Sequence, residues 1–208
     1  MYIPPHFREA DQDTLLAFIE AHGFATLVTC ATEGPIVSHL PLLLRRTTDG
    51  PTLVGHVARA NPHWRAMDGQ TGALAIFHGP HDYVSPSWYA SSPAVPTWNY
   101  AVVHAAGMPR TRDEDAFAAE VVRDLTHQYE DSRPHPWRVE DLPPEFHRKM
   151  LGAVVAFEMR IAHLEGKFKL SQNRTLEDRE GVIRGLEQAE SAATRALAAL
   201  MRGRTSSG

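Results

Sequence analysis

The first half of the chain consists largely of short stretches in which apolar and polar residues alternate. Alternation with a period of two is typical of half-buried β-strands, and turn signals such as Thr32–Pro35 and Thr47–Pro51 separate the stretches. We therefore expect antiparallel hairpins. The predicted strands are Phe24–Ala31, Ile36–Arg45, Thr52–Val57, Ala73–His78, the segment from Pro96 to about Ala106, and Ala153–His163, and residues 79–97 are expected to form an ordered loop with a short strand.

Other segments carry apolar residues at helical spacing. In Asp11–His22, residues Leu15, Phe18 and Ile19 recur on one face and Gly23 follows as a stop signal. The other predicted helices are a short one opened by Asn61-Pro62, then Asp113–Tyr129, Pro143–Leu151, Thr175–Glu187 and Ser191–Met201. Strands spaced roughly ten residues apart, with helices around them, predict a mainly β fold with peripheral helices, an α+β arrangement built on a closed or split β-barrel of roughly six strands.

Length and composition fit a soluble protein with a real core. Of the 208 residues, 43% are apolar, and we expect a single domain over residues 1–202 with a helical insertion at about 113–151 and a frayed tail at 203–208. The net charge of −4 gives no general basic field for nucleic acid or an anionic membrane. The one cysteine excludes an intrachain disulfide framework. No signal peptide or membrane span is expected, so we predict a cytoplasmic location.

The densest group of hydrogen-bond donors is the segment GKFKLSQNR at Gly166–Arg174. It follows an apolar alternating run and precedes a helical pattern, and function tends to lie where loops leave rigid elements. A phosphate or another polar ligand suits such a segment. The candidate residues in it are Lys167, Lys169, Ser171, Gln172 and Asn173.

A second polar group is GHVARANPHW at Gly55–Trp64. A strand delivers His56 and Arg59, and a helix begins at Asn61, so free N–H groups and an arginine together favour an anion site. An ordinary strand–helix corner with an exposed arginine is an equal alternative from this segment alone. The donors at Gly166–Arg174 favour the anion interpretation.

Two further features are open to more than one interpretation. Trp88, Trp98 and Tyr100 lie among prolines, where their rings could wall a planar ligand or cover a barrel end or a dimer seam. Ser38 and His39 are adjacent in an apolar strand, so only one of them can face a given ligand, and a satisfied polar group inside the barrel is the favoured alternative for either.

The sequence gives little support for a metal site or for a nucleophile. The chain has 12 histidines, but they are scattered and no HExxH motif occurs, so no metal site is expected. P-loop, GxGxxG and GxSxG motifs are absent as well. No residue stands out as a general base.

Six blocks occur in an order that resembles the PaiB family: MYIPPHF, SHLP, GHVARANPHW, YVSPSWY, VPTWNYAVVHAAG and GKFKLSQNR. The resemblance covers Met1 to about Met201. It implies an FMN-binding split barrel, usually a homodimer with flavin at the subunit interface, and the label of a negative transcriptional regulator. The candidate FMN ligands are then Arg59, Asn61, Lys167 and Lys169 for the phosphate, Trp88, Trp98 and Tyr100 for the ring, and His39, His56, Ser171, Gln172 and Asn173 for other contacts.

Three functional classes remain open at this stage: a flavin-dependent reductase, a flavin- or haem-binding sensor, and a DNA-binding regulator. No helix-turn-helix is evident, and Glu and Asp interleave with the arginines of Arg174–Arg204, so we expect no direct sequence-specific DNA binding. A homodimer is expected because the aromatic, proline-stiffened loop is too apolar to be left in water.

Overall fold

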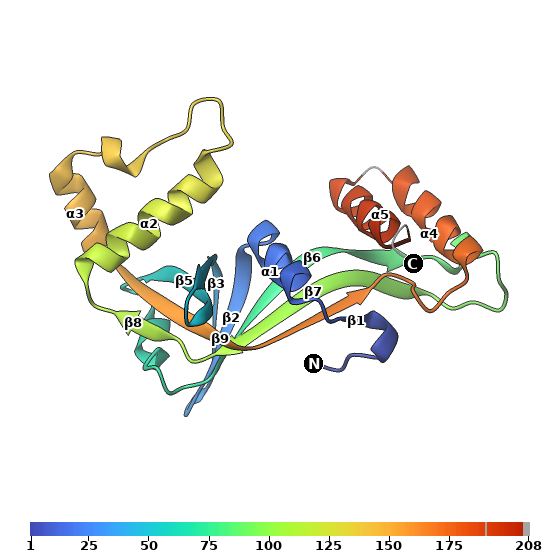
Figure 1. Cartoon of the computed structure of the whole chain (residues 1–208), viewed down its shortest axis with the longest axis horizontal. Helices are drawn as coiled ribbons and strands as arrows, with labels where there is room; N and C mark the ends of the chain where they lie inside the picture. Colours follow the sequence, from blue (N-terminus) through green and yellow to red (C-terminus); the bar gives the residue numbers. More distant parts are fainter. Residues whose placement is uncertain (190, 206–208) are drawn as a thin grey trace. The chain divides into compact units, whose positions relative to one another are not determined.

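The computed structural model describes residues 1–189 and 191–205 (Figure 1). Over these residues the chain forms nine strands and five α-helices. The strands are β1 (Arg8–Glu9), β2 (Phe24–Ala31), β3 (Gly34–Pro41), β4 (Leu43–Thr47), β5 (Gly50–Ala58), β6 (Ala73–Val84), β7 (Thr97–Gly107), β8 (Arg110–Arg112) and β9 (Val154–Lys169). The helices are α1 (Gln12–Ala21), α2 (Asp115–Glu130), α3 (Pro144–Gly152), α4 (Leu176–Gln188) and α5 (Ala192–Thr205), with 3-10 turns η1 (Pro5–Phe7), η2 (Pro62–Ala66), η3 (Pro86–Trp88) and η4 (Val139–Asp141).

The strands run antiparallel in the order β3-β2-β6-β7-β9-β5-β4, and β1 and β8 both pair with β9. This confirms the predicted antiparallel, mainly β fold with peripheral helices, although the described residues hold nine strands rather than roughly six. Strand β2 has the predicted bounds. Strands β1 and β8 were missed because segments of two and three residues are too short to show alternation.

Three predicted strands differ from the structure by a break or by more than two residues at one end. The predicted strand Ile36–Arg45 is divided into β3 and β4 at Leu42, whose N–H donates to the carbonyl oxygen of Gly23 at 2.8 Å and whose side chain is buried. Strand β6 continues to Val84, into the region predicted as a loop. Strand β9 continues to Lys169, so the first four residues of GKFKLSQNR belong to a strand and not to a loop.

The chain divides into two compact units, which are described separately below. The central unit comprises Leu16–Phe77 and His104–Leu164. The terminal unit comprises Met1–Leu15, His78–Val103 and the described chain from Glu165 onward. The single domain over residues 1–202 stays a prediction.

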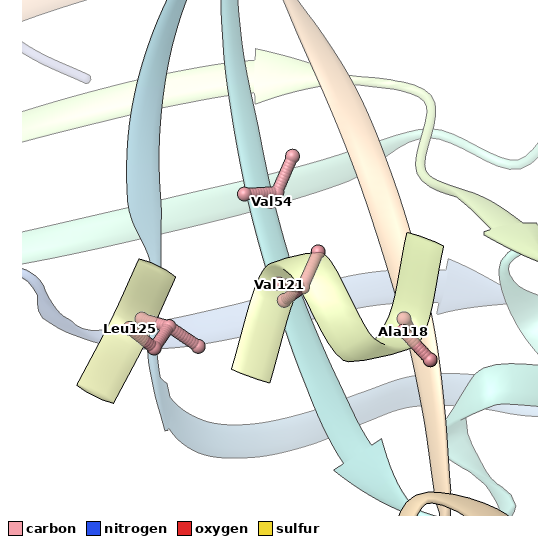
Figure 2. Packing of buried hydrophobic residues seen from close by; sticks show 5 residues of the cluster. Val54, Ala118, Val121 and Leu125 are labelled. Atoms are coloured by element: carbon pink, nitrogen blue, oxygen red, sulfur yellow. The ribbon is translucent and has the colours of Figure 1, made fainter. Parts of the chain in front are cut away.

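In the central unit, the helical insertion packs on the sheet through a small apolar cluster (Figure 2). Residues Ala118, Val121 and Leu125 recur at helical spacing on α2 and are buried against Val54 of β5 and Ala156 of β9. Spacings of three and four residues place these side chains on one face, so burial of that face holds α2 on the strands.

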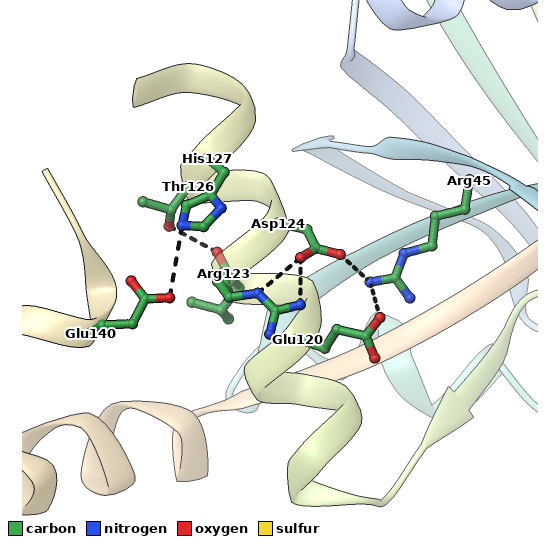
Figure 3. Close-up of polar contacts among 8 residues, drawn as sticks. Arg45, Glu120, Arg123, Asp124, Thr126, His127 and Glu140 are labelled. Carbon is green, nitrogen blue, oxygen red and sulfur yellow. Dashed lines mark hydrogen bonds and ion pairs between the residues drawn. The ribbon is translucent and has the colours of Figure 1, made fainter. Parts of the chain in front are cut away.

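Ion pairs also join helix α2 to strand β4 (Figure 3). The guanidinium of Arg45, on β4, lies 2.6 Å from a carboxylate oxygen of Asp124 and 3.0 Å from one of Glu120, both on α2. Arg123 also pairs with Asp124, at 2.8 Å. Because Arg45 comes from the sheet and its partners from the helix, these contacts orient α2 as well as hold it.

In the terminal unit, η3 packs on helix α4. The carbonyl oxygen and the indole of Trp88 lie where side chains at Gly181 and Gly185 would be: a Cβ on Gly181 would be 2.0 Å from the oxygen, and one on Gly185 would be 2.4 Å from the ring. The carboxylate of Asp178 accepts hydrogen bonds from the N–H groups of Ala90 and Ser91, both at 2.9 Å. The η3 turn is therefore fixed to α4 by close packing and by hydrogen bonds.

The end of the chain also differs from its prediction. Helix α5 extends to Thr205, so Gly203–Thr205 are helical and not a frayed tail. The guanidinium of Arg204 is ion-paired with Glu9 and lies over the ring of Phe168, 4.6 Å from its centroid, which gives this last turn tertiary contacts. The predicted tail residues 206–208 lie outside the described part of the chain.

We predict that Gly181→Ala lowers the free energy of unfolding by about 1–3 kcal/mol, because the new methyl group meets a backbone carbonyl that cannot move aside. Denaturant titration of the parent and the variant measures this. The matched control is Gly203→Ala in α5, where a Cβ meets no heavy atom of the described residues outside its own helix backbone and chain neighbours within 4 Å. This control should be neutral or stabilising by about 0.5–1 kcal/mol. Equal effects of the two substitutions would contradict the packing described here.

Candidate functional site

The sequence-predicted site residues fall into two groups, one in each unit. His39, His56, Arg59 and Asn61 belong to the central unit. The others belong to the terminal unit and are Trp88, Trp98, Tyr100, Lys167, Lys169, Ser171, Gln172 and Asn173. Each group is built up below from its own contacts.

In the central unit, the strand-to-helix corner after β5 is held by a buried polar network. The Asn61 side chain caps η2 by accepting from the N–H of His63 at 3.0 Å, and its amide nitrogen donates to Ser38 Oγ at 3.0 Å. The imidazole of His63 is fully buried between Ser38 Oγ and Thr29 Oγ1, with both contacts 2.8 Å long. Asn61 is thereby fixed, as the predicted helix start requires, but its polar atoms are already bonded within the protein.

Sequence reasoning did not select His63, although it lies in the GHVARANPHW segment. It did predict that Ser38 and His39 face opposite sides of their strand, and the structure agrees. Ser38 is buried in the network, whereas His39 is exposed, with its Nδ1 3.1 Å from Thr26 Oγ1. Alternation along a strand gives this orientation, but only the fold shows that an imidazole from another element meets Ser38.

Arg59 and His56 have different surroundings at the same corner. Arg59 donates from Nε to the carbonyl oxygen of Gly152 at 2.8 Å and from Nη2 to that of Val154 at 3.0 Å, so it braces the junction between α3 and β9. Its Nη1 remains available, and an anion-binding role stays a prediction. The Nδ1 atom of His56 is buried without a hydrogen-bond partner among the described residues, and burial lowers the pKa of this imidazole.

In the terminal unit, Lys169 lies at the end of β9 beside β7. Its ammonium donates to Thr97 Oγ1 and to the carbonyl oxygen of Trp98, both at 2.6 Å, and the side chain is half-buried. The pKa of Lys169 is lowered, first by burial and then by the positive charges of Lys167 and Arg174. The positive charges of Lys167, Lys169 and Arg174 therefore lie close enough together to repel one another.

Lys169 and Arg174 line a cavity of about 170 Å³ that we call the cationic pocket. No Asp or Glu of the described residues contributes to its lining. Its residues are Phe7, Tyr89, Val95, Pro96, Thr97, Lys169, Ser171, Asn173 and Arg174. Arg174 lies over the ring of Tyr89, 4.6 Å from its centroid, so its charge is held at the wall by an aromatic face.

The turn that leaves β9 has an unusual backbone. Ser171 has φ = 63°, and it is the only non-glycine residue with positive φ in the described part of the chain. Its buried hydroxyl accepts from the side-chain amide of Asn99 at 2.9 Å, and Asn99 is also fully buried. This bond holds the left-handed turn that brings Asn173 and Arg174 beside Lys169.

Several predicted ligands have structural roles. Gln172 bonds back to the end of β9, accepting from the N–H of Leu170 at 2.7 Å and donating to the carbonyl oxygen of Phe168. Trp88 packs on α4, as described above. Trp98 is 53% exposed, and its ring makes an edge contact with Tyr83 at 6.4 Å between centroids.

Lys167 and Tyr100 interact with each other. The Lys167 ammonium lies 5.4 Å from the centroid of the Tyr100 ring and 5.5 Å from that of Tyr2. Sequence reasoning therefore selected Lys169, Ser171 and Asn173 of the cationic pocket but omitted Arg174 and Tyr89 from its candidates. The signal for Arg174 was present, since it is the last residue of GKFKLSQNR.

The described residues show neither a cluster of metal ligands nor a helix suited to a membrane. No three or more His, Cys, Asp or Glu side chains come together there in a way that would hold a metal ion. None of the helices in that part of the chain is both long and apolar enough to cross a membrane.

Solved structures with a similar fold include the flavocytochrome Anf3 from Azotobacter vinelandii and the FAD and heme binding protein from Mycobacterium smegmatis. The first has a TM-score of 0.62 and 20% identity, and the alignment covers 86% of this chain and 78% of that one. The second has a TM-score of 0.62 and 18% identity, with coverage of 84% and 78%. With its antiparallel sheet, the protein is thus a split β-barrel.

Residues 1–163 match the family described as "Putative FMN-binding domain", and the chain belongs to this family. It is also 35% identical to "Protease synthase and sporulation protein PAI 2" of Bacillus subtilis (strain 168), over 97% of this chain and 96% of that protein. These matches confirm the resemblance to the PaiB family and confirm FMN as the family's cofactor.

The buried network predicts a dependence of stability on pH. Burial lowers the pKa of His63 below its ordinary value of 6.5, so the unfolded chain binds a proton more readily than the folded protein does. The stability that neutral His63 contributes is therefore fully present above pH 6.5 and is lost as the pH falls through the lowered pKa. We expect His63→Gln to reduce the free energy of unfolding by about 1–3 kcal/mol near pH 8 and to flatten its decline between about pH 7 and 5.

Chemical denaturation across this pH range tests the prediction, with His135→Gln at an exposed position as the control. The pKa values of His22 and His56 are also lowered by burial, so the slope should flatten rather than vanish. A slope as steep in His63→Gln as in the parent would show that His63 does not contribute to it.

Proposed function

We propose that this protein is an FMN-dependent oxidoreductase that holds the FMN phosphate in the cationic pocket of the terminal unit. The observation that carries the proposal is the pairing of Lys169 and Arg174 around a cavity that no carboxylate lines, in a chain of the FMN-binding family. The pocket volume, about 170 Å³, suits a phosphate group and is too small for the flavin ring as well.

The charges of the pocket fit this ligand. A phosphate monoester carries close to two negative charges at neutral pH, and charge-assisted hydrogen bonds are stronger than neutral ones. Lys169 keeps one N–H beyond its bonds to Thr97 and Trp98, and no carboxylate of the described residues is hydrogen-bonded to the guanidinium of Arg174, which lies over the ring of Tyr89. The nearby carboxylate of Asp178 is engaged by Ala90 and Ser91.

The oxidoreductase part of the proposal rests on the chemistry that the cofactor supplies. FMN, when bound, accepts and donates hydride or single electrons. In this proposal Lys169 and Arg174 bind and orient the cofactor through its phosphate, and Trp98, with its exposed indole, offers a flat wall for the ring.

The similar proteins support a redox role more than direct DNA binding. Two fold neighbours are described as a flavocytochrome and as an FAD and heme binding protein, whereas the Bacillus subtilis relative is described by protease synthesis and sporulation. A regulatory effect through flavin chemistry accommodates both descriptions. The spectrum of the purified protein separates flavin from haem, because a Soret band marks haem.

We expect Arg174→Gln and Lys169→Met to raise the Kd for FMN about ten- to a hundred-fold, since each removes a charge-assisted contact worth roughly 1.5–3 kcal/mol. The Kd for riboflavin, which has no phosphate, should change far less. Isothermal titration of both flavins measures this selectivity. Arg184→Gln, an exposed position on α4, is the matched control and should leave both values unchanged.

Arg59→Gln forms a separate arm of the same experiment. If this substitution alone reduced the preference for FMN over riboflavin, the phosphate would belong to the corner in the central unit and the cationic pocket would be the wrong site. Failure of the parent protein to bind either flavin would contradict the proposed function itself.

The proposal includes a homodimer, and the outer face of β3-β2-β6 in the central unit is the surface that fits it. Phe24 is 66% exposed and Val37 is 51% exposed. The strand register places Val37 beside Val28 and Val28 beside Leu74 on this face. None of the outward positions on these strands in the central unit, Phe24, Thr26, Val28, Cys30, Pro35, Val37, His39, Pro41, Leu74 and Ile76, is Asp, Glu, Lys or Arg.

An uncharged apolar face is complementary to itself, which a two-fold dimer requires. We expect light scattering to give twice the chain mass of 23.1 kDa for the parent protein. Val37→Asp should shift the protein substantially to monomer, because a dimer of this variant would bury one carboxylate from each protomer side by side. Val37→Thr, similar in shape and uncharged, should remain a dimer. A parent protein that is monomeric at micromolar concentration would refute this surface.

A further inference from the structure

A second cavity lies within the central unit, away from every residue that the flavin proposal uses. Its volume is about 520 Å³, and strands β8 and β9 and the β4–β5 turn supply its walls. We call it the arginine cavity, after the three guanidinium groups in its lining. The residues used below are Asp49, Thr52, Arg110, Arg112, Glu158 and Arg160.

The strand register explains why these side chains meet. Thr52 is the partner of Arg160, and Arg110 is the partner of Glu158, and directly paired residues of antiparallel strands share a face. Alternation places Ala156 on this face too, and Ala156 belongs to the cluster covered by α2. The arginine cavity is thus formed by the polar end of a face whose apolar part is covered by the helix.

One of the three arginines is fully engaged. Arg112 donates from Nη1 to Glu158 Oε1 at 2.9 Å, and from Nε and Nη2 to the carboxylate of Glu114 at 3.2 and 3.1 Å. Its guanidinium also lies over the ring of Phe117, 4.9 Å from the centroid. Arg112 therefore fixes Glu158 and has little capacity for a further ligand.

The other two arginines retain most of their donors. Arg110 donates from Nη2 to the same Glu158 oxygen at 2.6 Å, and its aliphatic stem would lie 3.6 Å from a Cβ on Gly69. Among the described residues Arg160 makes one hydrogen bond, a long one from Nη1 to the carbonyl oxygen of Asp49 at 3.4 Å. Since a guanidinium has five N–H donors, both arginines have a free edge for bidentate contact with an oxyanion.

We propose that the arginine cavity binds a small organic anion with one carboxylate or phosphate group, held by Arg110 and Arg160. Arg112 is ion-paired with Glu114 and Glu158, and Arg110 with Glu158, whereas no carboxylate of the described residues is ion-paired with Arg160, so the cavity offers one unpaired positive charge, which favours one oxyanion group over a polyanion. Met108, 58% exposed, also lines the cavity and offers an apolar contact for the organic part.

The test uses benzoate as the carboxylate probe, phenyl phosphate as the phosphate probe and benzamide as an uncharged analogue. Each is titrated into the isotopically labelled full chain, with and without saturating FMN, and backbone amide shifts are followed by NMR. We expect saturable shifts at Gly69, Asp49 and Glu158 with one or both anions and none with benzamide. The anion with the lower Kd, benzoate or phenyl phosphate, identifies which oxyanion group the cavity prefers.

Arg160→Gln should raise the Kd of the bound anion about ten-fold or more. The Kd of this variant for FMN should equal that of the parent protein. Arg148→Gln, an exposed arginine on α3, is the matched control and should not change the anion Kd. Arg174→Gln should also leave it unchanged, which separates this cavity from the cationic pocket. Shifts with benzamide as large as with benzoate, or equal anion affinity in Arg160→Gln and parent, would overturn the proposal.

Discussion

The hydrogen-bond ladder of strand β9 is the constraint on which most of this structure depends. Over its 16 residues this strand pairs with β1, β5, β7 and β8. A ladder fixes register, and register fixes which side chains share a face. The register of β9 with β5 places Arg160 opposite Thr52, and its register with β1 places Lys167 opposite Arg8. A slip of one residue would move each of these cations to the opposite face.

Local signals in the sequence were sufficient for elements whose ends are marked by turn residues. Strand β2 and helix α1 are examples, since a glycine-containing turn or a stop residue follows each of them. The extent of β9 was not predictable in this way. Gly166 and Lys167 look like a loop by composition, but they are held in the strand by pairing with β1, a partner that is distant in sequence and only two residues long.

The candidate site was predictable in residue type more than in role. Lysine and arginine in GKFKLSQNR indicated an anion site, and the fold does gather Lys169 and Arg174 around one pocket. No pattern in the sequence indicates that Gln172 bonds to its own strand end or that Arg59 bonds to carbonyl oxygens near α3. A sequence pattern shows side chains but not which backbone carbonyl oxygens lie near them. Whether a side-chain donor bonds to such an oxygen or stays available for a ligand is therefore decided by tertiary structure.

The left-handed backbone at Ser171 has a consequence for the thermodynamics of ligand capture. A serine in this conformation costs conformational energy that a glycine would avoid, and the buried hydroxyl bond to Asn99 offsets that cost during folding. The loop that carries Asn173 and Arg174 is thus already ordered before any ligand arrives. Association then loses less chain entropy, so a rigid turn contributes to affinity without touching the ligand.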